Sequence, residues 1–190
     1  MDIKEHKKRL RENIKNSLQL TEDQRKQNSL ILNNKIISSP LYKECSTLLA
    51  FISTKDEIEI DSIIDLALKE SKEVALPVVE QTMLAFYKID LHWKDNLVEG
   101  KWGLKEVNKE HYQRFDNFKE PLLILVPALA FSHSKVRLGR GKGFYDRFLS
   151  TLKVNFTTVG VCYDSQVLAT LPAEKHDIKV DYIVTPTISI

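Results

Sequence analysis

The segment that most constrains this chain is residues 137–146, RLGRGKGFYD, which holds three glycines and three cationic side chains. An uncharged apolar run at 122–127 precedes it, and such a run is typical of a strand buried on both faces. After it, apolar residues recur at helical spacing from 145 to 152. Glycines let backbone N–H groups approach an anion, and the start of a helix adds partial positive charge. The order strand, glycine loop and helix therefore predicts a phosphate-binding site.

Two plainer interpretations of the segment stay open. The glycines could form only a mobile turn, and Arg137, Arg140 and Lys142 could be solvated surface cations. The pattern is not a Walker A loop, because Lys142 is followed by Gly143 and not by a Ser or Thr that would hold Mg²⁺. A dinucleotide-binding fingerprint also fails, because no acidic residue ends a following strand about 20 residues on.

Length and composition favour one soluble domain over residues 1–190. The chain is 43% hydrophobic, enough for one sizeable core, and its formal charge of +2 is too small to predict a nucleic-acid partner. Cys45 and Cys162 lie far apart in apolar surroundings and are expected to be reduced, buried thiols. The N-terminus lacks the apolar core of a signal peptide, and no run of about 18 apolar residues occurs. We therefore expect a cytoplasmic protein with no membrane partner.

Hydrophobic periodicity predicts an α/β fold, a three-layer α/β/α sandwich around a mainly parallel sheet with ligands at the strand ends. Strand, helix and strand between 47 and 77 form a βαβ unit, which requires a parallel pair. Thr21 and Gln24 predict a capping box at the start of the second helix, and Pro40 is expected to end that helix. Residues 90–120 are expected to be a loop with short strands. The remaining expected elements are helices at 3–19, 21–38 and 61–71 and strands at 47–53, 73–77, 83–89, 157–163 and 182–184.

Two further groups of charged residues are candidates for ligand contacts. Lys7 and Arg11 are four positions apart, so they project from one face of the first helix and could reach the same phosphate chain. Glu57 and Glu59 follow a strand at the sheet edge where α/β proteins bind ligands. In both cases the alternative is that the charges only solvate a surface helix or a turn. The five histidines form no pair at metal spacing, so no zinc site is expected.

Ten consecutive positions, 137–146, resemble the signature of the 5-formyltetrahydrofolate cyclo-ligases, in which Arg-Leu-Gly-x-Gly-x-Gly-[Tyr/Phe]-Tyr-Asp follows a buried strand. The resemblance extends over nearly all of the chain, including the basic N-terminal helix, residues 56–59 and residues 176–181. It implies an enzyme that uses ATP and Mg²⁺ to convert 5-formyltetrahydrofolate into 5,10-methenyltetrahydrofolate, with release of ADP and phosphate.

The resemblance also implies roles for individual residues. Arg140 and Lys142 would be the catalytic, charge-stabilising groups, and Asp146 and Asp177 would hold Mg²⁺, although Asp177 could also be a turn residue. The residues implied to bind ATP are Lys7, Arg11, Arg137, Gly139, Arg140, Gly141, Lys142, Gly143 and Tyr145. The residues implied to bind the folate are Ile52, Glu57, Trp102, Phe144 and Tyr145, with Glu106 as a further match to a family loop.

The sequence departs from the family pattern at three places. Val107 stands where the family usually has proline, Ala128 where it more often has glycine, and Ser132 where it has a carboxylate, so Ser132 is given no ligand role. A monomer is expected. Two other functions remain as alternatives: a non-catalytic nucleotide- or RNA-binding protein, or a small-molecule kinase. The first would need exposed aromatic residues among the cations, and here these are confined to Phe144 and Tyr145.

Overall fold

A computed structural model describes residues 2–190 and places a six-stranded sheet at the centre. Its strands, in spatial order, are β11 (Tyr182–Val184), β9 (Phe156–Val161), β6 (Leu122–Pro127), β1 (Thr47–Leu49), β2 (Glu73–Glu80) and β3 (Met83–Lys88). Every neighbouring pair is parallel except β2 and β3, which are antiparallel. The mainly parallel sheet is thus confirmed, and so is the parallel pairing of β1 with β2.

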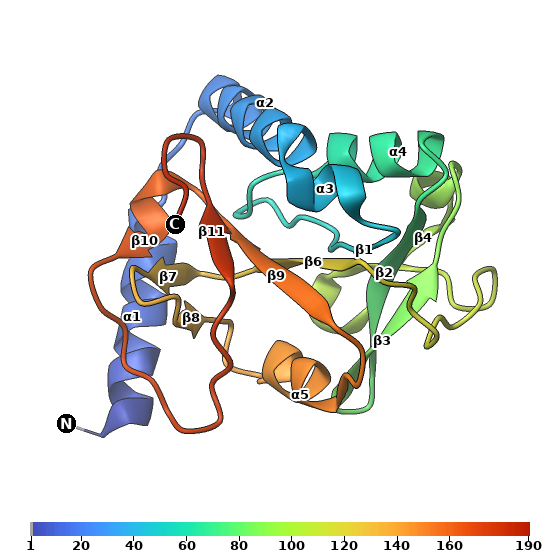
Figure 1. Ribbon diagram of the computed structural model, residues 1–190. Coiled ribbons are helices and arrows are strands. Elements are labelled where there is room, and N and C mark those ends of the chain that lie inside the picture. The colour runs from blue at the N-terminus through green and yellow to red at the C-terminus, as the bar shows by residue number, and fades with distance from the viewer. Residues whose placement is uncertain (1) are drawn as a thin grey trace.

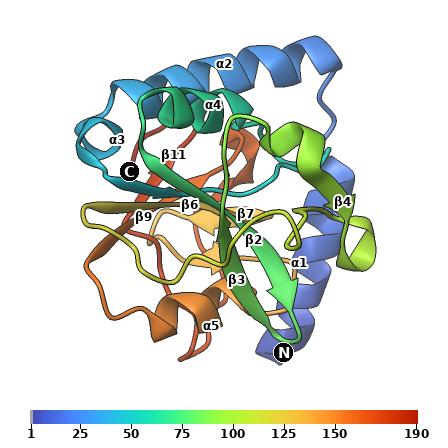
Figure 2. The same cartoon turned by 90° about the vertical axis from the view of Figure 1, so that its right-hand side faces the viewer.

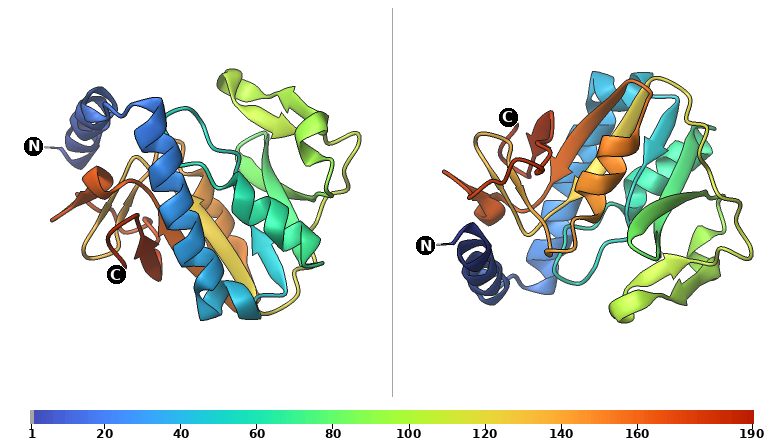
Figure 3. Two further views of the ribbon diagram at one scale, coloured as in Figure 1. Left: turned by 90° about the horizontal axis from the view of Figure 1, so that it is seen from above. Right: turned by 90° about the horizontal axis from the view of Figure 1, so that it is seen from below.

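Helices cover both faces of this sheet, as Figures 1 and 2 show. One face carries α2 (Glu22–Ser38), α3 (Pro40–Glu44) and α4 (Asp61–Lys69), and the other carries α5 (Phe144–Thr151). Seen from above and below in Figure 3, α2 crosses the sheet on one side and α5 lies against it on the other. Apolar faces explain the two layers: α4 buries Ile63 and Ile64, and α5 buries Phe148 and Leu149. The three-layer α/β prediction is confirmed.

The start of α2 has the predicted capping box. Gln24 donates its backbone N–H to Oγ1 of Thr21 at 3.2 Å, and Thr21 donates its own N–H to Oε1 of Gln24 at 2.9 Å. Pro40 follows the end of α2 and is also the first residue of α3, a position where proline loses no hydrogen bond. Ser39 serves both helices, since it ends α2 and its Oγ accepts the N–H of Tyr42.

Two strand boundaries differ from the prediction by three residues or more. The strand expected at 47–53 ends at Leu49, and residues 50–60 continue as irregular chain although Phe51, Ile58 and Ile60 are buried. Apolar composition reports burial, and it cannot separate a buried strand from a buried loop. The strand expected to end at Pro77 runs on to Glu80. Pro77 lies beyond Ala75, the last residue of β2 paired with β1, so the strand is paired on one side only, where proline is tolerated.

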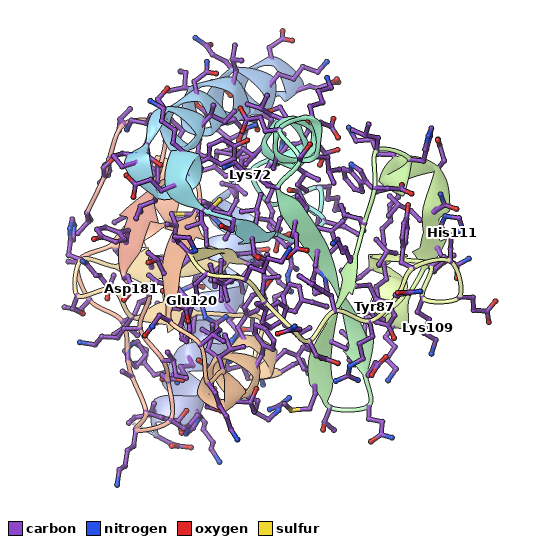
Figure 4. The ribbon with its side chains drawn as sticks, turned by 45° about the vertical axis from the view of Figure 1, so that its right-hand side comes forward. Lys72, Tyr87, Lys109, His111, Glu120 and Asp181 are labelled. Carbon is purple, nitrogen blue, oxygen red and sulfur yellow. The ribbon has the colours of Figure 1, made fainter. Side chains whose placement is uncertain are left out.

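Smaller elements complete the chain. Residues 90–120 contain two 3₁₀ turns and the hairpin of β4 (Leu97–Glu99) with β5 (Lys105–Val107), in line with the expected loop with short strands. In Figure 4, Lys109 and His111 of this region lie well away from Asp181. A second sheet joins β10 (Val167–Leu168), β7 (Ala130–Ser132) and β8 (Arg137–Leu138), and α1 (Ile3–Ser17) stands beside it (Figure 1).

Both cysteines are buried free thiols, as expected. Within residues 2–190, no helix has both the length and the apolar character that crossing a membrane would require.

Candidate active site

One large cavity, of about 970 Å³, opens where the carboxyl ends of β1 and β6 meet the glycine loop. Its size lies near the upper end of the range for ligand pockets, roughly 300–1,000 Å³. The structure brings every site residue predicted from the sequence to this cavity: Lys7, Arg11, Ile52, Glu57, Trp102, Arg137, Gly139, Arg140, Gly141, Lys142, Gly143, Phe144, Tyr145, Asp146 and Asp177. These residues come from five separate stretches of the chain, so only the fold makes them neighbours.

The glycine loop has the backbone shape that its sequence requires. Gly141 and Gly143 have φ angles of +94° and +63°, a region that favours glycine. At Gly139 a Cβ would lie 2.6 Å from a guanidinium nitrogen of Arg137, so any larger residue there would displace the end of that side chain. Gly143 caps α5 without any side-chain hydrogen bond, which leaves the first N–H groups of the helix for an anion.

The N-terminal helix reaches the cavity through its cations. Lys7 is 5% exposed and is the one buried residue of α1. Its ammonium donates to Oε2 of Glu174 at 2.9 Å and to Oδ2 of Asp177 at 2.6 Å. Four residues on, Nε of Arg11 donates to the carbonyl oxygen of Gly139 at 2.9 Å. Lys7 is therefore a buried, ion-paired group and not a solvated surface cation, while Arg11 contacts the glycine loop directly.

A buried ion pair supports the wall behind the loop. Arg137 donates to Oδ2 of Asp146 at 2.7 Å, and the other carboxylate oxygen, Oδ1, accepts the N–H of Ile178 at 3.1 Å. Two buried atoms nearby, Nε of Arg137 and the hydroxyl of Tyr145, have no hydrogen-bond partner within residues 2–190. Burial raises the pKa of the Tyr145 hydroxyl, and the charge of Glu57 raises it further. Because buried polar groups are normally hydrogen-bonded, these two atoms point to polar ligand atoms in the cavity.

Arg140 connects the glycine loop to the loop that follows β1. Its guanidinium donates to Oγ1 of Thr54 at 2.8 Å and to Oε1 of Glu57 at 3.1 Å. Glu59, the other carboxylate considered from the sequence, is exposed, and its backbone N–H bonds Ser29 of α2. Of the two acidic residues, only Glu57 faces the cavity.

Two aromatic side chains, Trp102 and Phe144, form an aromatic wall of the cavity next to the glycine loop. Trp102 is 58% exposed and has a φ of +59°, a strained conformation for a residue other than glycine. Its ring lies 5.7 Å from that of Phe144, and the ammonium of Lys142 lies 5.2 Å from its centroid. A large exposed ring held at a strained backbone position beside a cavity is typical of a ligand contact.

The carboxylates of the cavity have the chemistry of a magnesium site. Mg²⁺ prefers hard oxygen ligands, and Asp146 and Asp177 both line the cavity. The N–H of Ile178, the residue after Asp177, donates to Asp146 and so links the two segments. Burial opposes ionisation of Asp177, but hydrogen bonds from the Glu174 N–H and from Lys7 outweigh it, so the pKa of Asp177 lies below its ordinary value. Asp177 therefore stays anionic at neutral pH, as a metal ligand must. Oxygen donors of this kind suit Mg²⁺, and both oxygens of Asp146 also accept hydrogen bonds within the protein, from Arg137 and from the N–H of Ile178.

The cavity residues that were not predicted from the sequence include Glu174, His176 and Arg147. The ligand atoms of Glu174, His176 and Asp177 lie within 4.8 Å of one another. Glu174 stands three residues before Asp177, a spacing that closes a turn, since the Asp177 carboxylate accepts the Glu174 N–H at 2.6 Å. From its spacing alone, Glu174 would be predicted to be a turn residue. Its contact with Lys7 becomes visible only in the structure, where α1 packs against this turn.

Comparison with known proteins identifies the family. The model of the 5-formyltetrahydrofolate cyclo-ligase family matches residues 3–186. A probable 5-formyltetrahydrofolate cyclo-ligase from Caenorhabditis elegans is 32% identical, over 96% of this chain and 93% of the relative. One from Schizosaccharomyces pombe is 30% identical, over 83% of each. The NMR structure of 5,10-methenyltetrahydrofolate synthetase from Aquifex aeolicus superposes with a TM-score of 0.77 at 31% identity, covering 100% of this chain and 92% of that one. Since the family model spans almost the whole chain, this protein is an enzyme of the 5-formyltetrahydrofolate cyclo-ligase family.

Proposed function

We propose that this enzyme converts 5-formyltetrahydrofolate into 5,10-methenyltetrahydrofolate at the expense of ATP, releasing ADP and phosphate. The observation that carries the proposal is that one cavity of about 970 Å³ combines a cationic glycine loop with an aromatic wall. The cationic glycine loop suits the phosphate chain of ATP, and the aromatic wall suits the pterin ring of the folate. The two substrates must meet at one point for a phosphoryl group to pass between them.

The cationic side of the cavity would hold ATP. Arg11 and Arg137 both lie against the loop, and the N–H groups of Gly141 and Gly143 together with the start of α5 would supply donors for phosphate oxygens. The hydrogen bond that Nε of Arg137 lacks would be made to one of these oxygens. Lys7 would complete the set.

The aromatic side would hold the folate. Trp102 and Phe144 offer ring faces at the mouth, and Ile52 offers an apolar surface deeper in the cavity. Glu57 would accept hydrogen bonds from the N–H groups of the pterin, since it lines the cavity. Tyr145 also lines the cavity, and its hydroxyl, which has no hydrogen-bond partner within residues 2–190, would contact either substrate.

The chemistry would need no protein nucleophile. The formyl oxygen attacks the γ-phosphorus and ADP leaves; the nitrogen at position 10 then attacks the activated formyl carbon and loses its proton, and phosphate departs with the former formyl oxygen. Arg140 and Lys142 would stabilise the charge that develops on the moving phosphoryl group. Mg²⁺, held by Asp146 and Asp177, would neutralise charge on the phosphates.

One assay tests the proposal. Protein, Mg-ATP and 5-formyltetrahydrofolate are mixed, and the near-ultraviolet absorbance of the methenyl product is followed together with ADP and phosphate. Product, ADP and phosphate are expected in equal amounts. ADP release that does not depend on the folate would contradict the proposal, and a stable phosphorylated product would favour the kinase alternative. Binding of RNA without turnover would favour the non-catalytic alternative. The expected cytoplasmic monomer stays a prediction.

A further inference from the structure

The contacts of Lys7 give one cavity residue a specific task. An ammonium has three N–H donors. Two of those on Lys7 are taken by carboxylates, Glu174 at 2.9 Å and Asp177 at 2.6 Å, and the third remains for the cavity. The Lys7 side chain is 7% exposed, so these two contacts decide where its charge lies. Burial opposes the charge, but the hydrogen bonds that Lys7 donates to Asp177 and Glu174 outweigh it, and the pKa of Lys7 lies above its ordinary value.

The same contacts hold the whole helix. Among the residues of α1, only Lys7 is buried, and Ile3 is 42% exposed. Leu10 and Ile14 are only half-buried, so the apolar face of the helix makes a partial contact, where a helix usually joins a domain through a buried apolar face. The helix also docks through Lys7 on residues 174 and 177 and through Arg11 on the carbonyl of Gly139. Because Lys7 and Arg11 are cations on one face, the docked position of α1 also sets two of the charges that face the phosphates.

Asp177 cannot hold Lys7 and α1 in place alone if it also binds the metal. Its Oδ2 already accepts from Lys7 and from the N–H of Glu174, and coordination of Mg²⁺ would draw on the same carboxylate. Glu174 is the other carboxylate in contact with Lys7, and its ligand atom lies within 4.8 Å of those of His176 and Asp177. We infer, on the basis of the proposed function, that Glu174 is a positioning residue that keeps Lys7 and α1 against the cavity while Asp177 serves the metal.

Binding of Mg-ATP in the absence of folate, measured by calorimetry, tests this role apart from turnover. Glu174→Gln removes the charge but keeps the shape, and it should weaken Mg-ATP binding about tenfold, the loss typical for a hydrogen bond to a charged group, while leaving folate binding unchanged. Amide hydrogen exchange of residues 3–17 should speed up in the same variant. The matched control is Glu12→Gln, an exposed glutamate of α1 that changes the net charge equally and should bind Mg-ATP like the wild type.

A double-mutant cycle shows whether Glu174 acts through Lys7. In a Lys7→Met background, Glu174→Gln should change Mg-ATP affinity by less than about twofold, because the group that it positions is gone. Glu174→Asp, which keeps the charge, should recover part of the lost affinity, and it serves as the test should Lys7→Met fail to fold. Wild-type affinity and exchange in Glu174→Gln, or an equal tenfold loss in both backgrounds, would overturn the inference and leave the proposed function intact. A wild-type protein that does not bind Mg-ATP would remove both.

Discussion

Lys142 is the residue on which the proposed chemistry depends most. It stands between two glycines, is exposed, and contacts the Trp102 ring through its ammonium at 5.2 Å. If its charge acts mainly while the phosphoryl group moves, Lys142→Met should lower kcat by about 3 to 4 kcal/mol, on the order of a few hundredfold, with little change in KM for either substrate. Lys153→Met, at another exposed lysine, is the control. A folded Lys142→Met enzyme with near wild-type turnover would show that Lys142 is only a solvated cation.

Asp146 and Asp177 carry the metal prediction. Asparagine at either position should raise the Mg²⁺ concentration needed for half-maximal activity, because each change removes an anionic oxygen ligand. The two variants should differ in stability. Asp146→Asn leaves Arg137, whose side chain is 6% exposed, without its counter-charge, which should cost about 3–5 kcal/mol of unfolding free energy. Magnesium titrations and denaturant unfolding measure both effects. A wild-type titration for Asp177→Asn would remove that residue from the site.

At the scale of elements, α1 is expected to act as a phosphate-binding arm. Arg11→Ala should raise KM for ATP more than KM for the folate, because Arg11 contacts the glycine loop and not the aromatic wall. Lys7→Ala should do the same, and it should also lower stability, since it leaves two carboxylates without their shared cation. Arg9→Ala, an exposed cation of the same helix, is the control. Equal changes in both KM values would place the helix elsewhere in the mechanism.

At the scale of the whole molecule, a tyrosine at the edge of the sheet should make the protein less stable at alkaline pH. Tyr87 on β3, labelled in Figure 4, donates its hydroxyl to Glu80 at 2.5 Å. That hydrogen bond, together with burial, raises the pKa of Tyr87 from 10.0 to about 12. A group whose pKa is higher in the folded state stabilises the fold below its unfolded pKa, so this contribution is complete at pH 8 and is lost as the pH rises from 10 towards 12.

Tyr87→Phe removes that contribution. The variant should be less stable than the wild type at pH 8, and the difference between them should shrink at pH 11, as measured by urea unfolding at both values. Tyr182→Phe, at a tyrosine that is 44% exposed, should leave the pH dependence unchanged. A constant difference between wild type and Tyr87→Phe at the two pH values would contradict the assignment.

By itself, the sequence determined the fold class and the approximate position of the site. Burial periodicity marked β6, β9 and α5, the Thr21 and Gln24 pair marked the start of α2, and the glycines at 141 and 143 marked a loop with left-handed backbone. These features are local, because each depends on residues within a few positions of one another. They could therefore be read without the tertiary structure. Where local composition was ambiguous, as after Leu49, the prediction of a longer strand was wrong.

Only the tertiary structure decided how the charges pair. Lys7 and Asp177 are separated by 170 positions, and Arg140 and Glu57 by 83, so no local pattern joins them. The fold places the carboxyl ends of β1 and β6 beside the glycine loop and brings α1 against residues 174 and 177. Lys7 and Arg11, which the sequence alone could not distinguish from solvated surface cations, thereby gain fixed partners. The residues that the sequence predicted all line the cavity, but Glu174, His176 and Arg147 line it too and were not predicted. Burial and distance, which exist only in the folded chain, determine what each of those groups can do.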